Sequence, residues 1–236
     1  MSTAESVAAL YTRGSVIKVC GIREPEHAAA AAEAGADALG FIFAPARRQV
    51  TAEIAHTCIQ AARRANPNVL ACGVFVNAPA DEIAGIVELA GLDFVQLSGN
   101  ESPDFVAGLP VPATKVFHPK PEFTAEDVVR SIRSYQVPEI PPVAFLLDAF
   151  STKGAGGTGE KVNWGLASGV NAHVPVVLAG GLDPTNVAEA IRVVQPQGVD
   201  VSSGVEIEGR KSVERIHAFV AAARAAFASE AAITPR

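Results

Sequence analysis

The chain alternates eight times between a short apolar segment and a helical segment, and this alternation limits its fold more than any other feature. Most of the apolar segments are continuous and rich in β-branched residues, which is typical of strands buried on both faces of a parallel sheet. The expected strands are Val16–Cys20, Ala38–Phe43, Val69–Val76, Phe94–Leu97, Ala113–Phe117, Val143–Leu147, Val176–Leu178 and Val199–Val201.

A helical pattern follows each expected strand. The expected helices are Glu26–Glu33, Ala52–Arg63, Asp81–Leu89, Ser102–Ala107, Thr124–Ser134, Asn163–Ser168, Pro184–Val193 and Ser212–Ala226. Eight such units with short connections predict a fold of the α/β class, a single (β/α)8 TIM barrel. A doubly wound open sheet is the alternative.

The barrel is expected to span residues 16–228, because no linker or change of composition divides this part of the chain. Residues 1–15 are rich in Ser, Thr and Ala and are expected to form a short, flexible N-terminal arm. Residues 229–236 are expected to form a C-terminal tail. A length of 236 residues is common for an α/β barrel that folds as one domain.

The composition argues against several classes of function. The formal net charge is −6 and no cluster of Lys and Arg stands out, so neither nucleic acid nor a membrane is expected as a partner. No apolar run approaches the roughly 20 residues of a membrane span, and no signal-peptide pattern is present. The three cysteines form no disulfide or metal-binding pattern, which favours a reduced, cytoplasmic protein without a metal site.

Candidate catalytic residues are expected at the ends of the strands, because the active site of a parallel barrel forms from the loops that follow them. Cys20 ends the first strand and Asp148 follows the sixth, so a thiol and a carboxyl group can act there as base and acid. The alternatives are an inert buried thiol for Cys20 and a helix cap or loop ion pair for Asp148. Lys18 shares the face of Cys20 one layer below, where it needs a partner and would favour the thiolate.

Two glycine-containing turns, Gly180-Gly181 and Ser203-Gly204, follow the seventh and eighth strands. Glycine lets backbone amides approach a phosphate closely, and barrels often bind a phosphate in these two loops. Ordinary tight turns are the alternative. The glycine-rich segment 154–159 lacks the ending of a nucleotide-binding loop and is more typical of a lid that closes over a substrate.

Taken together, these motifs resemble one family, phosphoribosylanthranilate isomerase of tryptophan biosynthesis. The resemblance covers about residues 16–225 and rests on Lys18–Ile22, Gly35–Phe43, Gly73–Asn77, Asp93–Leu97, Leu147-Asp148, Gly156–Gly159, Trp164, Leu178–Leu182, Pro184, Asn186 and Asp200–Glu206. It implies a TIM barrel and an Amadori rearrangement of N-(5-phosphoribosyl)anthranilate, an aminoaldose, to 1-(2-carboxyphenylamino)-1-deoxyribulose 5-phosphate. It also implies a small phosphorylated aminosugar as substrate, no cofactor and no metal. A monomer or a homodimer is expected.

The resemblance implies roles for single residues as well. Cys20 resembles the general base that removes the C2 proton of the ring-opened iminium, and Asp148 the general acid that protonates the furanose ring oxygen. Arg48 resembles the arginine that meets the anthranilate carboxylate, with Arg47 as the alternative if the loop register differs. The other implied substrate contacts are Gly180, Gly181, Ser203 and Gly204 around the phosphate and Asp183 near the sugar hydroxyls.

Two stretches depart from the family pattern. Ala46-Arg47-Arg48 stands where the family usually has Ser-Pro-Arg, and Ser98-Gly99 where it commonly has His-Gly. The alternatives are a related or dual-substrate isomerase of histidine biosynthesis and a non-catalytic barrel that binds phosphosugars. The histidine-pathway enzymes typically set an aspartate at the first strand, where this chain has Cys20. An indole-forming lyase is disfavoured because no catalytic lysine follows the expected strands.

Overall fold

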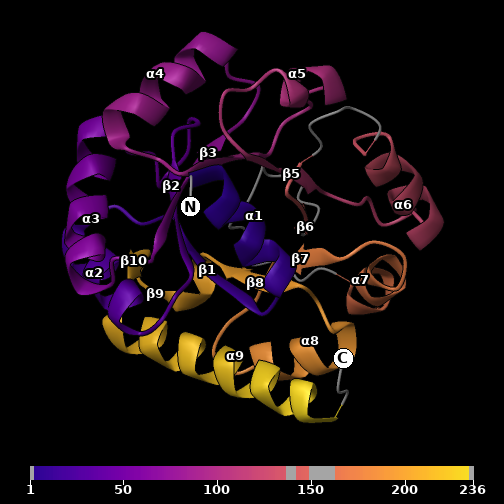
Figure 1. The fold of residues 1–236 in the computed structure, drawn as a ribbon. Helices are drawn as coiled ribbons and strands as arrows, with labels where there is room; N and C mark the ends of the chain where they lie inside the picture. The colour runs from indigo at the N-terminus through magenta and orange to yellow at the C-terminus, as the bar shows by residue number, and fades with distance from the viewer. Residues whose placement is uncertain (1–2, 137–141, 149–162, 234–236) are drawn as a thin grey trace.

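Eight parallel strands close into a barrel at the centre of the molecule (Figure 1). The computed structural model describes residues 3–136, 142–148 and 163–233. Each strand pairs with its neighbours in chain order, and β8 pairs with β1, so the predicted TIM barrel is confirmed and the open sheet is excluded. The strands are β1 (Val16–Cys20), β2 (Ala38–Ile42), β3 (Leu70–Phe75), β4 (Phe94–Leu97), β5 (Ala113–Phe117), β6 (Ala144–Leu147), β7 (Val176–Leu178) and β8 (Gly198–Val201).

Helices surround the barrel and cover its outer surface (Figure 1). They are α2 (Pro25–Glu33), α3 (Ala52–Ala65), α4 (Ala80–Ala90), α5 (Pro103–Ala107), α6 (Ala125–Arg133), α7 (Trp164–Asn171), α8 (Val187–Val194) and α9 (Val213–Ile233). Helix α9 continues beyond residue 228, where the sequence predicted a tail, because its last turns are rich in alanine, the strongest helix former. A 3-10 turn η1 (Ser203–Val205) and a small hairpin, β9 (Glu206–Ile207) with β10 (Arg210–Lys211), lie between β8 and α9.

The sheet separates two apolar cores. Ile17 and Val19 of β1 pack outward against residues of the surrounding helices. Val16 belongs to a second core inside the barrel, together with Cys72 and Phe94. Because side chains alternate between the two faces of a strand, Lys18 and Cys20 also point into the barrel.

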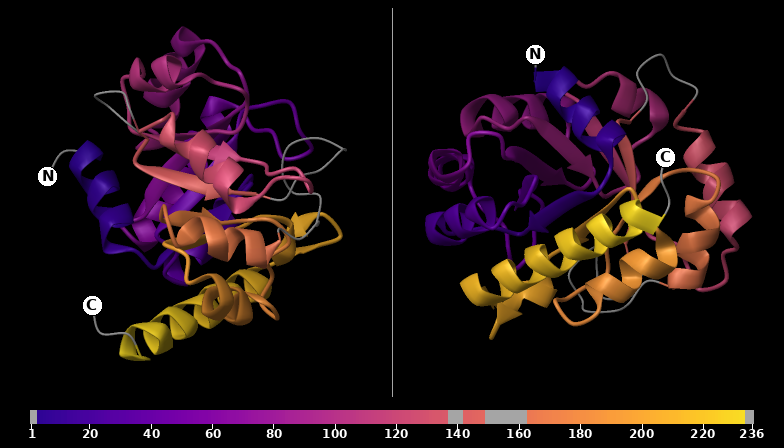
Figure 2. Two further views of the ribbon diagram at one scale, coloured as in Figure 1. Left: turned by 90° about the vertical axis from the view of Figure 1, so that its right-hand side faces the viewer. Right: turned by 60° about the horizontal axis from the view of Figure 1, so that its bottom comes forward.

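The first residues form a helix, whereas the sequence predicted a flexible arm. Helix α1 (Thr3–Arg13) buries Val7, Leu10 and Tyr11, whose spacing of three and four residues places them on one face. These side chains join the core inside the barrel, and the Tyr11 ring meets the Phe94 ring edge-on with 6.1 Å between centroids. Helix α1 therefore covers the end of the barrel where the strands begin (Figures 1 and 2).

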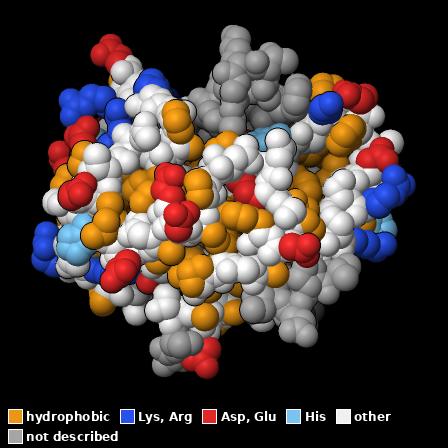
Figure 3. Space-filling view, turned by 90° about the horizontal axis from the view of Figure 1, so that it is seen from above, with side chains coloured by type: hydrophobic (Ala, Val, Ile, Leu, Met, Phe, Trp, Pro, Cys, Tyr) orange, Lys and Arg blue, Asp and Glu red, His pale blue; other side chains and the backbone are white. Residues whose placement is uncertain are grey.

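The outer surface over α4 and α5 mixes side chains of different kinds. Figure 3 shows acidic side chains scattered across the middle of this face, basic ones nearer its edges, and apolar ones between them. Among the helices of the described ranges, none is long and apolar enough to cross a membrane. The candidate catalytic residues lie at the end of the barrel opposite α1.

Candidate active site

A cavity of about 290 Å³ opens at the end of the barrel where the strands finish. Every strand, or the loop directly after it, contributes to its wall. The lining residues are Cys20, Ile42, Ala44, Pro45, Ala46, Arg48, Val74, Val76, Gln96, Ser98, His118, Asp148, Ala179, Gly180, Gly181, Leu182, Asp200, Ser202 and Ser203. Six of the eight candidate residues from the sequence thus meet around one space.

Cys20 lies on the wall of this cavity at the end of β1. It is 6% exposed and stands beside Gly40 of β2. A Cβ atom added at Gly40 would lie 2.6 Å from the Cys20 sulfur, closer than van der Waals contact allows. Glycine on the neighbouring strand therefore makes the space in which the thiol sits.

Lys18 lies one layer below Cys20 and is almost completely buried. Its Nζ donates hydrogen bonds to Asp200 Oδ2 at 2.8 Å and to Gln96 Oε1 at 2.9 Å. The partner that the sequence required for this ammonium thus comes from β8, with a second from β4. Burial alone would lower the pKa of Lys18, but the Asp200 carboxylate outweighs it and raises that pKa above its ordinary value. Lys18 is therefore a cation directly beneath the thiol.

Two opposing influences act on the Cys20 thiol. Burial raises its pKa above the ordinary value, while the Lys18 ammonium below it acts to lower that pKa. Because burial prevails, the thiol is protonated at neutral pH. A positive charge that arose in the cavity would add to the effect of Lys18 and favour the thiolate.

Asp148 is the first residue after β6 and lines the same cavity as Cys20. Its backbone N–H donates to the Phe117 carbonyl at 3.0 Å, which continues the ladder between β5 and β6 by one residue. Its side chain is partly buried. The ends of β1 and β6 therefore bring the candidate base and the candidate acid into one cavity.

The two glycine-containing turns lie next to each other. Gly180 and Gly181 line the cavity and adopt positive φ angles of 84° and 66°, a left-handed conformation that glycine adopts without strain. Gly204 follows Ser203 and does not line the cavity. A Cβ atom added at Gly204 would collide with the backbone carbonyl of Leu182. Glycine at position 204 therefore lets the turn after β8 touch the turn after β7.

Asp183 serves the turn in which it lies. Its carboxylate accepts hydrogen bonds from the Thr185 backbone N–H at 2.7 Å and from the Thr185 hydroxyl at 2.6 Å. It is not among the residues that line the cavity. Both hydrogen bonds fall on Oδ1, and the expectation that Asp183 holds the sugar hydroxyls stays a prediction.

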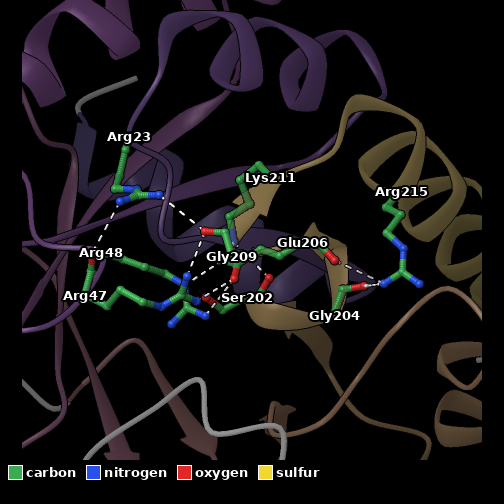
Figure 4. Close-up of polar contacts among 9 residues, drawn as sticks. All are labelled: Arg23, Arg47, Arg48, Ser202, Gly204, Glu206, Gly209, Lys211 and Arg215. Atoms are coloured by element: carbon green, nitrogen blue, oxygen red, sulfur yellow. Dashed lines mark hydrogen bonds and ion pairs between the residues drawn. The ribbon is translucent and has the colours of Figure 1, made fainter.

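Arg48 lines the cavity with its guanidinium paired to Glu206 (Figure 4). Its Nε donates to Glu206 Oε1 at 2.5 Å and its Nη2 to Oε2 at 3.0 Å. Arg47 and Lys211 donate to the same carboxylate at 2.7 and 3.2 Å. Burial works against ionisation of Glu206, but these cations lower its pKa to about 2. Arg47 is half exposed and outside the cavity wall, so the structure favours Arg48 as the cavity arginine.

Sequence reasoning gave no role to several residues that complete the site. Asp200 and Gln96 hold Lys18, whereas Glu206 and Lys211 adjoin Arg48. The acid at position 200 stands between two valines of a buried strand, and this isolated charge was a signal that a partner must exist.

Unpaired polar atoms mark where a ligand can bond. Within the described residues, His118 Nε2, Asp200 Oδ1 and Ser202 Oγ are buried without a hydrogen-bond partner, and all three residues line the cavity. Buried polar groups without partners are rare and costly, so the cavity is suited to a ligand with hydroxyl or amine groups. The candidate lid at 154–159 lies outside the described residues.

The sequence matches the family model of N-(5'-phosphoribosyl)anthranilate (PRA) isomerase over residues 17–222. The chain belongs to this family. The resemblance inferred from the motifs is thereby confirmed. The matched residues include all eight barrel strands apart from Val16, and both glycine-containing turns, whereas α1 lies before them.

Individual family members are similar over most of their length. An N-(5'-phosphoribosyl)anthranilate isomerase of Pelobacter propionicus is 44% identical to this chain, with 88% of the chain and 95% of the relative covered. One of Desulforudis audaxviator is 41% identical, with 90% and 99% covered. The crystal structure of phosphoribosyl anthranilate isomerase from Thermotoga maritima has a TM-score of 0.77 at 32% identity, over 89% of this chain and 98% of that one.

A second solved structure shows a family member with a bound molecule. It is a phosphoribosyl anthranilate isomerase in complex with reduced 1-(o-carboxyphenylamino)-1-deoxyribulose 5-phosphate, 31% identical to this chain with a TM-score of 0.73. It covers 89% of this chain and 98% of its own. That ligand carries a phosphate at one end and an aromatic carboxylate at the other.

Proposed function

We propose that this protein isomerises N-(5-phosphoribosyl)anthranilate to 1-(2-carboxyphenylamino)-1-deoxyribulose 5-phosphate, the Amadori step of tryptophan biosynthesis. One observation carries the proposal beyond family membership. A thiol, a carboxyl group, an arginine and two glycine-containing turns line a single cavity, at the ends of strands β1, β6, β2, β7 and β8. The reaction requires a base, an acid and a site for each anionic end of the substrate, and this set supplies them.

Asp148 is the general acid of the first step. It gives its proton to the furanose ring oxygen, the C1–O bond breaks, and the anthranilate nitrogen shares its electron pair with C1 to form an iminium cation. Asp148 lines the cavity wall, so its carboxyl group is placed to act on a substrate bound there.

Cys20 is the general base of the second step. The thiol first gives its own proton to water, and the thiolate then takes the proton from C2. The electrons of the C–H bond neutralise the iminium to give an enolamine, which tautomerises to the aminoketose. The iminium is a cation, so it adds to the influence of Lys18 and favours the thiolate at the moment when a base is needed. The C2 proton beside an iminium is acidic enough for a weak base.

The two anionic ends of the substrate meet different groups of the cavity wall. The planar anthranilate carboxylate meets the guanidinium of Arg48, whose fork of N–H donors matches two oxygens. The phosphate meets backbone amides of the turns that contain Gly180, Gly181 and Ser203, where glycine permits close approach. Gly204 contributes by letting these turns touch.

Two further expectations concern the state of the protein in the cell. A monomer or a homodimer is expected, and dimeric family members exist, as the Thermotoga maritima enzyme does. A cytoplasmic location is expected because all three cysteines are free thiols. Light scattering and fractionation of the source cells would test these two expectations.

The catalytic assignments are tested by steady-state turnover of freshly prepared phosphoribosylanthranilate, followed by the loss of anthranilate-type fluorescence. Cys20→Ala and Asp148→Asn should each lower kcat by about 10²–10⁴-fold, which is the usual contribution of a positioned base or acid. Cys58→Ala is the matched control, because Cys58 lies in the outer core on α3 and away from the cavity. Near wild-type turnover in either active-site variant would reject that residue's role.

A further inference from the structure

We propose that Glu206 is a positioning residue, which fixes the guanidinium of Arg48 so that its free edge faces the carboxylate of the substrate. The inference rests on the proposed function, in which Arg48 binds the anthranilate carboxylate. It adds a residue that does not touch the substrate itself and acts on substrate binding through Arg48. Four observations carry it.

The first observation is the way the two side chains join. Glu206 accepts from Nε and from Nη2 of Arg48, and thus occupies the lateral edge of the guanidinium. The N–H groups at the terminal edge, on Nη1 and the second of Nη2, bond no other described residue. Arg48 lines the cavity, so this edge is the one available to a ligand there. A bidentate partner on one edge fixes the plane of the guanidinium and the direction in which the other edge points.

The second observation is the balance of charge. Arg48, Arg47 and Lys211 all donate to the one carboxylate of Glu206, so the cluster retains an excess of positive charge. The side chains of Arg48, Lys211 and Glu206 are each at least nine-tenths buried. An incoming carboxylate therefore meets a cationic site that is shielded from water, where charge-assisted hydrogen bonds are strong.

The third observation is that Glu206 itself is held rigidly. It opens the hairpin β9–β10, in which it pairs with Lys211. The Gly209 carbonyl at the hairpin turn accepts from Arg47 at 2.8 Å and from Arg23 at 3.4 Å (Figure 4). On the other side, Arg215 donates to the Gly204 and Glu206 carbonyls. These bonds hold the backbone of the hairpin that carries the carboxylate.

The fourth observation is the position of Glu206 along the chain. It follows directly on η1, which contains Ser203 and Gly204 of the proposed phosphate site. The Lys211 ammonium joins both parts, because it donates to the Ser202 carbonyl at 2.8 Å as well as to Glu206. The segment from Ser203 to Glu206 therefore carries parts of both the phosphate site and the carboxylate site. It fixes the distance between them, and a substrate with an anion at each end must match that distance.

The test compares binding of two stable reduced product analogues that differ only in the aromatic carboxylate: the 2-carboxyphenylamino and the phenylamino forms of 1-amino-1-deoxyribitol 5-phosphate. Calorimetry on Glu206→Gln should show about 10- to 100-fold weaker binding of the carboxylate form, the usual cost of losing hydrogen bonds to a charged group. Binding of the phenylamino form should change less than about threefold, since neither its phosphate nor its sugar touches Arg48. Equal losses for both analogues, or no loss for either, would overturn the inference.

Companion variants separate this inference from the proposed function. Arg48→Met should lose the same preference for the carboxylate form, and adding Glu206→Gln to it should cause no further loss. If Arg48→Met loses the preference and Glu206→Gln retains it, Glu206 is not the positioning residue although Arg48 still binds the carboxylate. If neither variant changes the preference, the carboxylate binds elsewhere and the role of Arg48 in the proposed function fails as well.

Two more variants control for folding. Glu206→Asp keeps the charge beside the buried cations but shortens the side chain by one methylene, so it should remain folded and still lose part of the preference. Glu24→Gln removes the exposed ion pair between Glu24 and Arg210 at 2.8 Å, which ties the same hairpin to the loop before α2. Binding of both analogues to Glu24→Gln should match the wild type. An unchanged preference in a folded Glu206→Asp protein would contradict the need for a bidentate fork.

Discussion

The buried ammonium of Lys18 couples the stability of the barrel to the chemistry of the Cys20 thiol. Removing a charge from water costs several kcal/mol unless partners compensate, and here Asp200 and Gln96 do so at 2.8 and 2.9 Å. The same charge lies one layer below the thiol and favours its ionised form. A substitution at Lys18 would therefore disturb both the packing inside the barrel and the ionisation of Cys20. The Cys20 thiol can be probed without a mutation.

The Cys20 thiol should react slowly with iodoacetamide at neutral pH. The thiolate is the reactive form, and burial raises the pKa of Cys20 above the ordinary thiol value, so the rate should keep rising through and beyond the range where an ordinary cysteine titrates. Mass-spectrometric mapping of the Cys20 peptide across a series of pH values measures this rate. A midpoint at or below that of a free thiol would mean that Lys18 outweighs burial.

At the scale of single residues, the sequence predicts which side chains need a partner but not which partner they find. Lys18 bonds Asp200 across 182 positions, and Arg48 bonds Glu206 across 158. Both pairs arise only when the last strand closes the ring and its loop folds back. The positions of Cys20 and Asp148 were predictable because a strand end is a local feature, and parallel strands bring their ends to one side.

Among the elements, the strands were predictable and the small hairpin was not. Each strand is a mostly apolar run of three to six residues, a signal that exists within the segment itself. Strands β9 and β10 have only two residues each, and β10 contains the buried Lys211. Such short segments carry no sequence pattern that predicts a strand. Contacts between loops, such as that of the two glycine-containing turns, also depend on the assembled barrel.

Gly204→Ala should weaken both the fold and phosphate binding. The new Cβ atom would meet the rigid backbone carbonyl of Leu182, so the two turns must separate. Overpacking of this kind costs about 1–3 kcal/mol, which urea unfolding would measure, and KM should rise with it. Gly85→Ala is the control: a Cβ atom there meets nothing within 4 Å, and alanine in helix α4 should add about 0.5–1 kcal/mol. Wild-type stability and KM in Gly204→Ala would contradict the close contact.

In the whole molecule, stability and chemistry are divided between the two ends of the barrel. Helix α1 closes the end where the strands begin (Figure 2). The cavity opens where the strands finish. The sequence contains the spacing of Val7, Leu10 and Tyr11 that makes α1 amphipathic. An isolated helix of 11 residues is marginal in water, however, and α1 gains its stability from the barrel interior against which it packs. That surface exists only after the ring has closed, so the composition of residues 1–15 alone predicted a flexible arm.

This division predicts that Tyr11→Ala lowers stability and leaves catalysis almost unchanged. Tyr11 is 3% exposed and packs edge-on against Phe94 of β4, so truncation leaves a cavity in the inner core that should cost roughly 3 kcal/mol. Urea unfolding would measure this loss, and Thr12→Ala, an exposed neighbour on the same helix, should change stability by less than about 0.5 kcal/mol. Turnover of phosphoribosylanthranilate below the unfolding transition should stay within about twofold of wild type, because distant sites behave independently. A large fall in kcat in the folded Tyr11→Ala protein would instead show that α1 acts on the cavity through the core that they share.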